Sequence, residues 1–341
     1  MSGQLQSQAS FETTILGFLY RQFTRQKPLS PDADLTDNVA VVTGSNTGLG
    51  LEAARQLLEL GLSHLILAVR TAAKGEAAAE RLRRDFPAAV VVVWIVDLES
   101  YPSVRAFAER CAGLTRLDIV ILNAGLMRPS YTIAPETENE LTLQVNYLST
   151  VLLAILLLPV LKASCVNGSR KPSVLSIVGS DLAYRARIET RGPVLQQFER
   201  PERYNGYEWY PMSKLLLTLF IAKLADIVDS DVVLINTVNP GMTKGTDFFR
   251  EFPSVLVKLM GLLQWLLARS VVVGAATYVD AVVSYGEESH GSFISDWAIK
   301  PYPPIYYTAE GRELRDRLWD ETMEELNFAG AASIVNSLRG D

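Results

Sequence analysis

A glycine-rich turn between an apolar run and a helical run constrains the fold of this chain more than any other feature. Residues 39–42 (VAVV) are continuously apolar, as expected of a strand buried on both faces. The turn at residues 43–50 (TGSNTGLG) follows at once, and a helix is predicted from there to Leu60, with Gly61 as its stop. A strand that leads into a helix in this way predicts the first half of a βαβ unit.

The same alternation of strand and helix continues along the chain. Alternating elements imply right-handed crossovers and a parallel sheet covered on both sides. The predicted fold class is therefore α/β, a doubly wound, Rossmann-like sheet in one domain over residues 36–341, ending in a helical extension. Strands are expected at residues 39–42, 63–69, 90–96, 117–122, 173–178 and 232–238. Helices are expected up to residue 60, at residues 72–85, 103–112 and 138–163, and around Tyr210.

Composition argues against several classes of function. The net charge of −6 and the scattered lysines and arginines argue against a nucleic-acid partner. His64 and His290 are too few for a histidine-based metal site or a Ser-His-Asp triad, so no metal is expected. Cys111 and Cys165 form no CxxC motif and suit a reducing compartment. The apolar run at residues 151–161 is too short to span a bilayer, and a cytoplasmic location is expected.

Residues 1–35 are interpreted as an N-terminal extension, a helix followed by a polar linker. Apolar residues recur every four positions in the helix, with charged and polar residues between them. The apolar positions are Phe11, Ile15, Leu19 and Phe23, and the polar ones are Glu12, Arg21, Gln22 and Arg25. Because charges interrupt the apolar stretch, a secretory signal is not expected. Packing on the domain or on a partner subunit is favoured, and contact with a membrane surface is the alternative.

The glycines of the turn predict a dinucleotide site. Gly44 permits the tight turn, while Gly48 and Gly50 let the backbone approach a pyrophosphate and let the helix meet the strand. The helix N-terminus adds unpaired N–H groups and the positive end of its dipole. A glycine triplet alone is weak evidence, but its place after the first strand of a βαβ unit favours nucleotide binding.

The end of the second strand indicates which dinucleotide is bound. An acidic residue about 20 positions after the glycines would favour NAD by binding the ribose 2′-hydroxyl. This chain has Arg70 there, with no acid next to it in sequence. A guanidinium pairs well with a 2′-phosphate, and Ser45 and Asn46 are expected to add hydrogen bonds. The predicted cofactor is therefore NADP(H), and an ordinary surface arginine is the alternative.

Tyr210 and Lys214 lie four residues apart in a run expected to form a largely buried helix, so their side chains share one helical face. A phenol alone has a pKa of roughly 10, but an ammonium within about 4–6 Å favours the phenolate. The pair is therefore a candidate for proton transfer. On its own this spacing is more often an aromatic anchor beside a solvated charge, so the other motifs must decide.

Taken in order, the motifs resemble those of the short-chain dehydrogenase/reductase superfamily, in its single-domain branch. They are Thr43-Gly44-x-x-x-Gly48-x-Gly50, Asn123-Ala124-Gly125, Asn146, Ser180, Tyr210-x-x-x-Lys214 and Pro240-Gly241. The resemblance covers residues 36–326. Two departures are small: Leu122 replaces the first asparagine of the family's NNAG motif, and the interval from Ser180 to Tyr210 is longer than in compact members.

Finer features are similar to two subgroups of the superfamily. The glycine turn, Arg70, the interval after Ser180 and residues 292–300 (SFISDWAIK) resemble the retinol-dehydrogenase and WW-domain-oxidoreductase group. The N-terminal extension and residues 312–327 (RELRDRLWDETMEELN) are similar to fungal reductases of secondary-metabolite pathways. A role in a fungal natural-product pathway is an expectation that rests on this resemblance.

The resemblance implies four catalytic residues. Tyr210 would be the general acid in reduction and the base in oxidation, and Lys214 would lower the Tyr210 pKa and bind the nicotinamide ribose. Ser180 would polarise the substrate oxygen, and Asn146 would hold a water that connects Lys214 to solvent. Because the cofactor supplies the hydride, the protein needs only to position two reactants and manage one proton.

The resemblance also implies the cofactor contacts. Asp97 would contact the adenine, with a helix N-cap as the alternative interpretation. Asn123 would close over the adenine ribose, and Thr243 would meet the nicotinamide carboxamide. The predicted cofactor-binding set is Gly44, Ser45, Asn46, Gly48, Leu49, Gly50, Arg70, Asp97, Asn123, Ala124, Gly125, Tyr210, Lys214, Pro240, Gly241 and Thr243.

The region after Pro240-Gly241 is rich in apolar residues, which suggests a hydrophobic carbonyl or alcohol substrate. Its apolar residues are Phe248, Phe249, Phe252, Leu256, Leu259, Met260, Leu262, Leu263 and Trp265. Tyr184, Tyr204 and Trp209 are candidates for the same wall, and a core or subunit-interface helix is the alternative. Residues 151–158 are apolar on all sides and must be buried. Because the matching helix lies at a two-fold interface in relatives, a homodimer is predicted.

The leading interpretation is an NADP(H)-dependent carbonyl reductase or alcohol dehydrogenase. One alternative is an NADP-binding scaffold that performs a non-redox cyclisation or isomerisation. Another is a cofactor-binding regulator whose partner surface is the N-terminal helix. A hydrolase that uses Ser213 or Ser180 with a lysine is remote, since no acyl-enzyme motif surrounds either serine.

Overall fold

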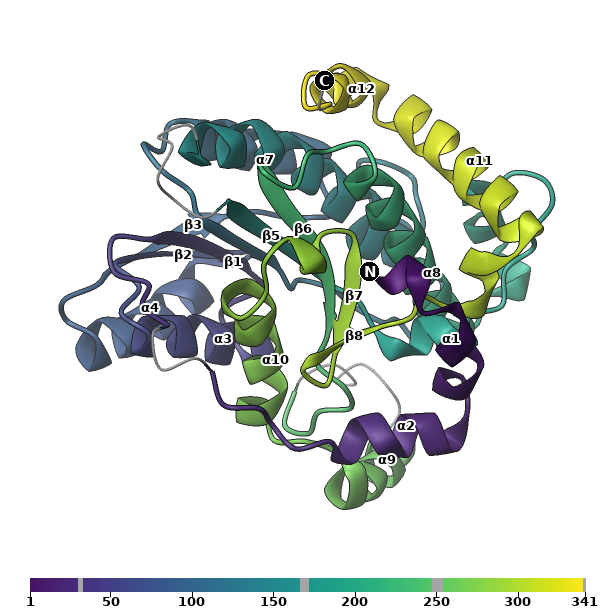
Figure 1. Ribbon diagram of the computed structural model, residues 1–341, viewed down its shortest axis with the longest axis horizontal. Helices are drawn as coiled ribbons and strands as arrows, with labels where there is room; N and C mark the ends of the chain where they lie inside the picture. Colours follow the sequence, from purple (N-terminus) through teal and green to yellow (C-terminus); the bar gives the residue numbers. More distant parts are fainter. Residues whose placement is uncertain (30–32, 166–171, 247–253, 340–341) are drawn as a thin grey trace.

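A computed structural model describes residues 1–29, 33–165, 172–246 and 254–339. Within these residues, one sheet of eight strands lies between two layers of helices (Figure 1). The strand order is β3-β2-β1-β4-β5-β6-β7-β8, and all neighbours are parallel except β7 and β8. The strands are β1 Val39–Thr43, β2 His64–Val69, β3 Val90–Ile95, β4 Ile119–Leu122, β5 Ser173–Val178, β6 Val233–Asn239, β7 Ser292–Ser295 and β8 Ala298–Lys300.

The strand order reverses between β1 and β4, which creates a crevice at the carboxyl ends of the strands. The longer helices are α3 Gly48–Glu59, α4 Ala72–Asp85, α5 Tyr101–Ala112, α7 Ser149–Cys165, α8 Gly206–Ala225, α9 Ser254–Leu267, α10 Val271–Val283 and α11 Ala309–Glu325. The shorter ones are α1 Gln6–Glu12, α2 Ile15–Phe23, α6 Leu141–Leu143 and α12 Ala331–Asn336. The predicted fold class, a doubly wound α/β sheet with a C-terminal helical extension, is confirmed.

Both faces of the sheet are buried, as the continuous apolar runs predict. In β1, Val41 belongs to the core beneath α5, α7 and α8, whereas Ala40 and Val42 belong to the core beneath α3, α4 and α10. The predicted stop at Gly61 is also correct. Gly61 has a φ of +85°, its N–H bonds Leu58, and the next N–H bonds Leu57, which is a Schellman cap.

The hairpin of β7 and β8 is not among the predicted strands. Its turn consists of Asp296 and Trp297, which have φ values of 46° and 59°. Two-residue hairpin turns that need positive φ usually contain asparagine, aspartate or glycine at both positions. Because the second position here is a tryptophan, the sequence does not indicate a turn. Trp297 is nearly fully buried and packs at 4.9 Å under the guanidinium of Arg269. Tertiary packing therefore holds a turn that local sequence preference does not indicate.

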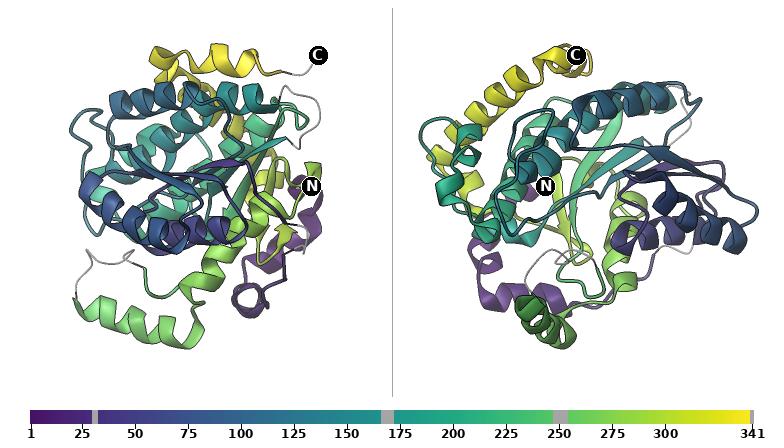
Figure 2. Two further views of the ribbon diagram at one scale, coloured as in Figure 1. Left: turned by 90° about the vertical axis from the view of Figure 1, so that its left-hand side faces the viewer. Right: turned by 180° about the vertical axis from the view of Figure 1, so that it is seen from behind.

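The apolar helix α7 is covered by the chain's own C-terminal helices. In Figure 2, α11 and α12 (yellow) lie over the helical layer that contains α7. Phe220 of α8 stacks on Trp319 of α11 at 4.9 Å, and Tyr147 hydrogen-bonds Thr322 at 2.6 Å. The continuous helix at residues 141–164 is long and apolar enough to cross a membrane by composition, but 94% of its most apolar window is buried, as in the core of a soluble protein.

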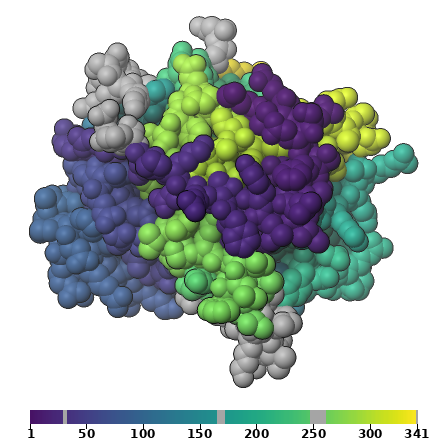
Figure 3. All heavy atoms as spheres, turned by 60° about the horizontal axis from the view of Figure 1, so that its bottom comes forward, coloured from purple at the N-terminus to yellow at the C-terminus, as the bar shows by residue number. Residues whose placement is uncertain are grey.

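The N-terminal extension forms two helices rather than the single helix predicted. Thr14 caps α2 by accepting a hydrogen bond from the N–H of Gly17, so the chain bends between α1 and α2. The orientation of α2 is the reverse of that expected for an amphipathic helix. Arg21 and Gln22 are each 4% exposed, whereas Ile15 is 70% exposed. The extension packs on the domain through polar side chains, whereas Ile15, Tyr20 and Phe23 are exposed. Figure 3 shows the extension (purple) lying over segments coloured green.

Candidate active site

Tyr210 and Lys214 lie in the first turns of α8, next to the carboxyl end of β5. The cap of α8 is Asn205, whose side chain accepts a hydrogen bond from the Tyr207 N–H. Tyr210 and Lys214 are 8% and 4% exposed. The Lys214 ammonium lies 5.8 Å from the centre of the Tyr210 ring and donates a hydrogen bond of 2.7 Å to the Val178 carbonyl. The two residues therefore face one buried site, as predicted.

Ser180 joins this pair from the loop that follows β5. Its hydroxyl oxygen accepts a hydrogen bond from the Leu182 N–H at 3.2 Å, which caps a short 3-10 helix. The Ser180 side chain also hydrogen-bonds Tyr210. Ser180, Tyr210 and Lys214 thus converge on the crevice at the carboxyl edge of the sheet, although they come from two elements 30 residues apart in sequence.

Burial dominates the ionisation of this site. Desolvation raises the pKa of Tyr210, the charge of Asp181 raises it further, and the hydrogen bond to Ser180 opposes both. Desolvation also lowers the pKa of Lys214 to about 8. The net shift of the Tyr210 pKa is therefore upward, because burial disfavours the phenolate. The expected lowering of the Tyr210 pKa by Lys214 stays a prediction. At neutral pH the phenol carries its proton and the ammonium is mostly charged.

Asn146 lies in a π-helical turn, Gln144–Leu148, between α6 and α7. Its Oδ1 accepts a hydrogen bond from the Leu126 N–H at 2.8 Å, and its Nδ2 donates to the Leu126 carbonyl at 2.8 Å and to Ser213 Oγ at 3.1 Å. A Cβ on Gly125 would lie 3.2 Å from Asn146 Oδ1 and 3.6 Å from Lys214 Nζ. Gly125 is thus the close neighbour of both groups. Regular helix was predicted here; π turns occur often at functional sites.

The glycine turn has the form that the sequence predicts. Gly44 and Gly48 have φ values of +63° and +57°, which favour glycine. A Cβ on Gly50 would lie 2.5 Å from Asn123 Nδ2 and 2.6 Å from the Gly44 carbonyl oxygen, so the close approach of α3 to the turn requires glycine. A Cβ on Gly48, at the start of α3, would have only Thr246 Cγ2 within 4 Å, at 3.9 Å. This glycine cradle therefore leaves room for a pyrophosphate beside the N-terminus of the helix.

Asn123 and Ala124 hold this turn in place. Asn123 Nδ2 donates to the carbonyls of Thr43 at 2.9 Å and Gly44 at 3.3 Å, and the Ala124 N–H donates to Thr43 Oγ1 at 3.0 Å. The Asn123 amide nitrogen is therefore directed at the turn. This structural role was not expected from the sequence, and the expected contact of Asn123 with the adenine ribose stays a prediction.

Ser45, expected to bind the 2′-phosphate, is fully buried, and its hydroxyl donates to the Val42 carbonyl at 2.7 Å. It stabilises the turn from inside, and the predicted phosphate contact is not available in this geometry. Asn46 is partly exposed on the turn. A short polar side chain inside a turn often bonds nearby backbone, and the sequence does not show which way it points.

Arg70 follows β2 and is half exposed, with 52% of its side chain accessible. It forms an ion pair with Glu99, which the sequence analysis did not anticipate because Glu99 follows a different strand. Asp97 is not a helix N-cap, so the alternative interpretation of this residue is wrong, and its predicted contact with the adenine stays a prediction. The cap of α5 is Ser100, while Asp97 Oδ1 accepts a hydrogen bond from the Glu99 N–H at 3.0 Å. Arg70 and Asp97 both border the carboxyl ends of β2 and β3.

The loop after β6 contains the remaining predicted cofactor residues. Gly241 has a φ of +72°, and the Thr243 hydroxyl donates to the Gly241 carbonyl at 3.2 Å. A Cβ on Gly274, near the start of α10, would lie 2.6 Å from Thr243 Oγ1 and 2.8 Å from Leu49 Cδ2. Leu49 of the glycine turn and Thr243 are therefore neighbours, as a shared cofactor site requires.

The predicted apolar substrate wall is only partly described. Phe248, Phe249 and Phe252, together with the side chains of Leu256, Leu259 and Met260, lie outside the described residues. Leu262 and Trp265 of α9 are 59% and 70% exposed, and Leu263 is 39% exposed. Tyr204 and Trp209 pack edge to face within an aromatic cluster, with ring centres 4.8 Å apart. Tyr184 instead packs against Phe293 and Arg21.

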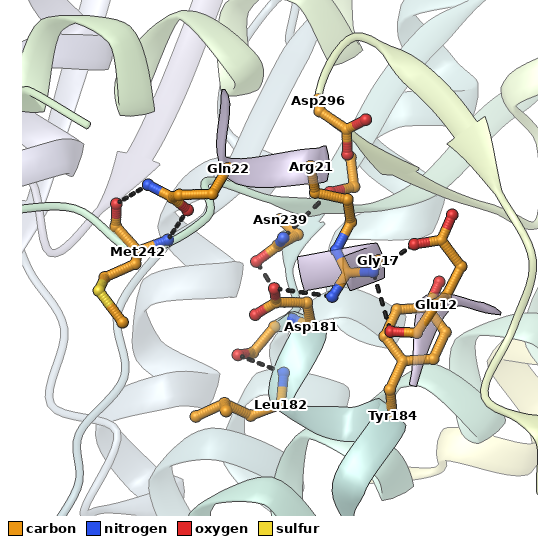
Figure 4. Close-up of polar contacts among 12 residues, drawn as sticks. Glu12, Gly17, Arg21, Gln22, Asp181, Leu182, Tyr184, Asn239, Met242 and Asp296 are labelled. Carbon is orange, nitrogen blue, oxygen red and sulfur yellow. Dashed lines mark hydrogen bonds and ion pairs between the residues drawn. The ribbon is translucent and has the colours of Figure 1, made fainter. Parts of the chain in front are cut away.

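Sequence reasoning missed a polar network beside the site. Arg21 pairs with Asp181, the residue after Ser180, and Gln22 bonds the backbone of Met242, two residues after Pro240 (Figure 4). These partners are 160 and 220 residues apart in sequence. The only available signal was the presence of Arg21 and Gln22 in an otherwise apolar helix. Among the described residues, no cluster of three histidine, cysteine or acidic side chains could hold a metal ion.

A doubly wound sheet, a glycine cradle after β1 and a buried Ser-Tyr-Lys site at the carboxyl ends of the strands define a dinucleotide-dependent class of α/β protein. The chain belongs to the short chain dehydrogenase family. The family model for short chain dehydrogenases matches residues 38–177. Short chain dehydrogenase virL of Hypocrea virens is 61% identical over 99% of both chains, and short chain dehydrogenase/reductase mfmJ of Annulohypoxylon moriforme is 45% identical over 95% of both.

Solved structures share the fold. An NADPH-bound short chain oxidoreductase from Pseudomonas aeruginosa PAO1, which has an atypical catalytic center, matches with a TM-score of 0.58 and 23% identity over 76% of this chain and 95% of that one. L-sorbose reductase from Gluconobacter frateurii, in complex with NADPH and L-sorbose, matches with a TM-score of 0.58 and 23% identity over 78% and 97%.

Proposed function

We propose that this chain is an NADP(H)-dependent oxidoreductase that reduces a ketone or aldehyde of a hydrophobic small molecule, or oxidises the matching alcohol. One observation carries the proposal: Ser180, Tyr210 and Lys214 are buried together at the same edge of the sheet as the glycine turn. Membership of the short chain dehydrogenase family gives the reaction class, because a bound nicotinamide supplies or accepts the hydride.

The chain's own residues would handle the proton. The Tyr210 phenol, kept protonated by burial, would donate to the carbonyl oxygen in reduction. The Ser180 hydroxyl would donate a second hydrogen bond to the same oxygen, so that charge developing there is stabilised without solvent. Lys214 Nζ and Asn146 Oδ1 both lie close to Gly125. A water molecule bound between these two groups would return a proton to Tyr210 through Lys214.

Several features support NADP(H) over NAD(H). Arg70 stands where NAD-binding sheets of this type have an acid, and half of its side chain is open to solvent. Glu99 is its present partner, and a 2′-phosphate, with up to two negative charges, would compete with one carboxylate for the guanidinium. The related structures from Pseudomonas aeruginosa and Gluconobacter frateurii were determined with NADPH.

The substrate, setting and assembly are parts of the same proposal. Relatives in Hypocrea virens, Annulohypoxylon moriforme and Aspergillus ruber support a fungal setting, and we propose a natural-product pathway and a cytoplasmic location. We also propose residues 36–341 as the cofactor-binding domain and residues 1–35 as its extension. The predicted homodimer stays a prediction with weaker support, because α7 needs no partner subunit to be buried. Sedimentation equilibrium would measure the assembly.

Parallel titrations of the purified chain with NADPH and NADH test the proposal, followed by NADPH oxidation with bulky hydrophobic ketones. Tighter binding of NADPH and ketone-dependent oxidation are expected. A Tyr210→Phe variant should bind NADPH normally and lose turnover by about 100-fold or more. Binding of neither dinucleotide would contradict the proposal. Substrate conversion without NADPH consumption would instead support the non-redox alternative.

A further inference from the structure

The N-terminal extension reaches the loop that carries Ser180 through one side chain. Arg21 Nη2 lies 3.2 Å from Asp181 Oδ2, and Arg21 Nη1 pairs with the Glu12 carboxylate and donates to the Glu12 carbonyl at 2.9 Å. The three side chains are 12% exposed or less. Figure 4 shows the guanidinium of Arg21 between Glu12 and Asp181. Because Asp181 is the next residue after Ser180, this contact restrains the loop that presents the Ser180 hydroxyl.

The neighbouring residue of α2 reaches the second loop of the site. Gln22 Oε1 accepts a hydrogen bond from the Met242 N–H at 3.0 Å, and Gln22 Nε2 donates to the carbonyls of Met242 and Leu267 at 2.8 Å each. The amide thus pairs with the backbone as a neighbouring strand would. Met242 follows Pro240-Gly241, so Gln22 restrains the loop that the proposed function assigns to the nicotinamide.

The two contacts belong to one buried network with balanced charge. Arg269 Nη1 donates to the Pro240 carbonyl at 3.2 Å, and the same guanidinium donates to the backbone carbonyls of Arg21 and Gln22. Inside the domain, Asn239 Oδ1 accepts a hydrogen bond of 3.2 Å from the Asp181 N–H. This bond directly connects the loop after β5 with the end of β6. The ion-paired members of the network are Glu12, Arg21, Asp181, Asp296 and Lys300, and Arg269 adds the third positive charge.

This arrangement is costly as a way to attach a helix. Charged groups lose hydration on burial, and a buried ion pair seldom stabilises a protein more than apolar side chains of the same shape would. Helix α2 nevertheless buries Arg21 and Gln22 and exposes Phe23, Tyr20 and Ile15. The polar contacts therefore determine where α2 docks, and Arg21 and Gln22 each make at least one contact with a loop of the proposed active site.

We propose that Arg21 and Gln22 are positioning residues of the active site, and that the N-terminal extension is part of the catalytic unit rather than an appendage. Arg21 holds the Ser180 loop through Asp181, and Gln22 holds the Pro240-Gly241 loop through Met242. This inference rests on the proposed roles of these two loops. A small displacement of a positioned group can reduce turnover about 100-fold, so loss of either contact should alter catalysis in a folded protein.

Two full-length variants test the inference separately. Arg21→Lys keeps the positive charge but cannot bond Glu12 and Asp181 together, and it is expected to lower kcat by about tenfold or more with little change in the Kd for NADPH. Gln22→Met removes the backbone pairing without removing a charge, and it is expected to raise the Kd for NADPH by about tenfold. Both are measured at a temperature where circular dichroism shows the variant to be folded.

Arg116→Met is the matched control. Arg116 forms a half-buried ion pair with Asp118 and bonds Asn38 at the opposite, amino end of the sheet. It should lower the Tm and leave kcat and the NADPH Kd unchanged. If Arg21→Lys and Gln22→Met resemble this control, with lower Tm and unchanged kinetics, the positioning role is wrong. If the unmodified chain neither binds NADPH nor reduces ketones, the proposed function has failed instead.

Discussion

Lys214 illustrates, at the scale of single residues, how burial sets the chemistry of the site. Its ammonium is 4% exposed and bonds one backbone carbonyl, so desolvation brings its pKa from 10.5 down to about 8. The neighbouring Tyr210 moves the other way, because its charged form is the phenolate. The same environment therefore favours a protonated acid and leaves its cationic neighbour close to losing its proton.

The lowered Lys214 pKa predicts how cofactor binding depends on pH. Lys214 is mostly charged below about pH 8 and mostly neutral above about pH 8. In an unfolded chain the same side chain would keep its proton up to about pH 10.5. The Kd for NADPH is therefore expected to stay nearly constant from about pH 7 to about pH 7.5, where the 2′-phosphate is already mostly doubly charged, and to rise above about pH 8. Fluorescence titration across pH measures this. A Lys214→Met variant should bind more weakly and show no such rise; the same rise in that variant would assign it to another group.

The Arg70–Glu99 pair leads to a second prediction at this scale. Arg70→Asp removes the guanidinium that would meet a 2′-phosphate and should weaken NADPH binding by about ten- to hundredfold, with little effect on NADH. Glu99→Gln removes the competing carboxylate and should strengthen NADPH binding. Paired titrations with both dinucleotides measure the two effects. An unchanged NADPH/NADH ratio in Arg70→Asp would show that Arg70 does not read the phosphate.

At the scale of elements, helix α2 shows how a periodic pattern can mislead. The apolar residues do repeat every four positions, but Ile15 and Phe23 of this repeat are exposed to solvent. The opposite face is buried because Arg21 and Gln22 form an ion pair and hydrogen bonds with the domain. A hydrophobic pattern predicts the inward face only when burial of apolar area is the main energy term. Here the partners of two polar residues decide it.

The reversed orientation of α2 makes a clear mutational prediction. Ile15→Gln replaces a side chain that is 70% exposed and should change the free energy of unfolding by less than about 0.5 kcal/mol. Gly17→Ala, two residues away, would place a Cβ against the Phe11 carbonyl and should cost about 1–3 kcal/mol. Urea denaturation compares them. A larger loss for Ile15→Gln than for Gly17→Ala would restore the amphipathic interpretation.

Other elements show the same division between local pattern and context. The strands of the sheet centre were predicted to within two residues, because strands buried on both faces are continuously apolar. The π turn around Asn146 was not, since a single helical run carries no mark of one inserted residue. The hairpin turn at Asp296 and Trp297 was missed because tryptophan does not favour positive φ.

At the scale of the whole molecule, the C-terminal extension completes the core. Helices α11 and α12 cover α7 and α8, so the apolar helix that suggested a dimer interface is enclosed by the chain itself. Leu314 and Leu318 of α11 are fully buried in this core. The extension is thus a structural layer and contributes directly to the stability of the helix that carries Tyr210.

This layer can be tested by one core substitution. Leu318→Ala would leave a cavity between α11 and α8 and should lower the free energy of unfolding by about 2–5 kcal/mol. Trp319, which stacks on Phe220 in the same layer, should fluoresce differently in the variant. Urea denaturation with tryptophan fluorescence measures both. A loss below about 0.5 kcal/mol would mean that α11 contributes little to the core.

The sequence alone was enough to predict the sheet and the glycine turn and to select Ser180, Tyr210, Lys214 and Asn146 as candidate site residues. These depend on local rules: apolar periodicity, backbone freedom at glycine and the chemical character of single side chains. Only the tertiary structure decided that Ser45 points inward, that Glu99 pairs with Arg70, that α2 docks by its polar face and that α11 and α12 enclose α7. The last three depend on partners far away in sequence, which only the packing of the whole chain brings together. The partner of Ser45 is local, the Val42 carbonyl three residues away, but sequence alone does not show that the turn buries this side chain.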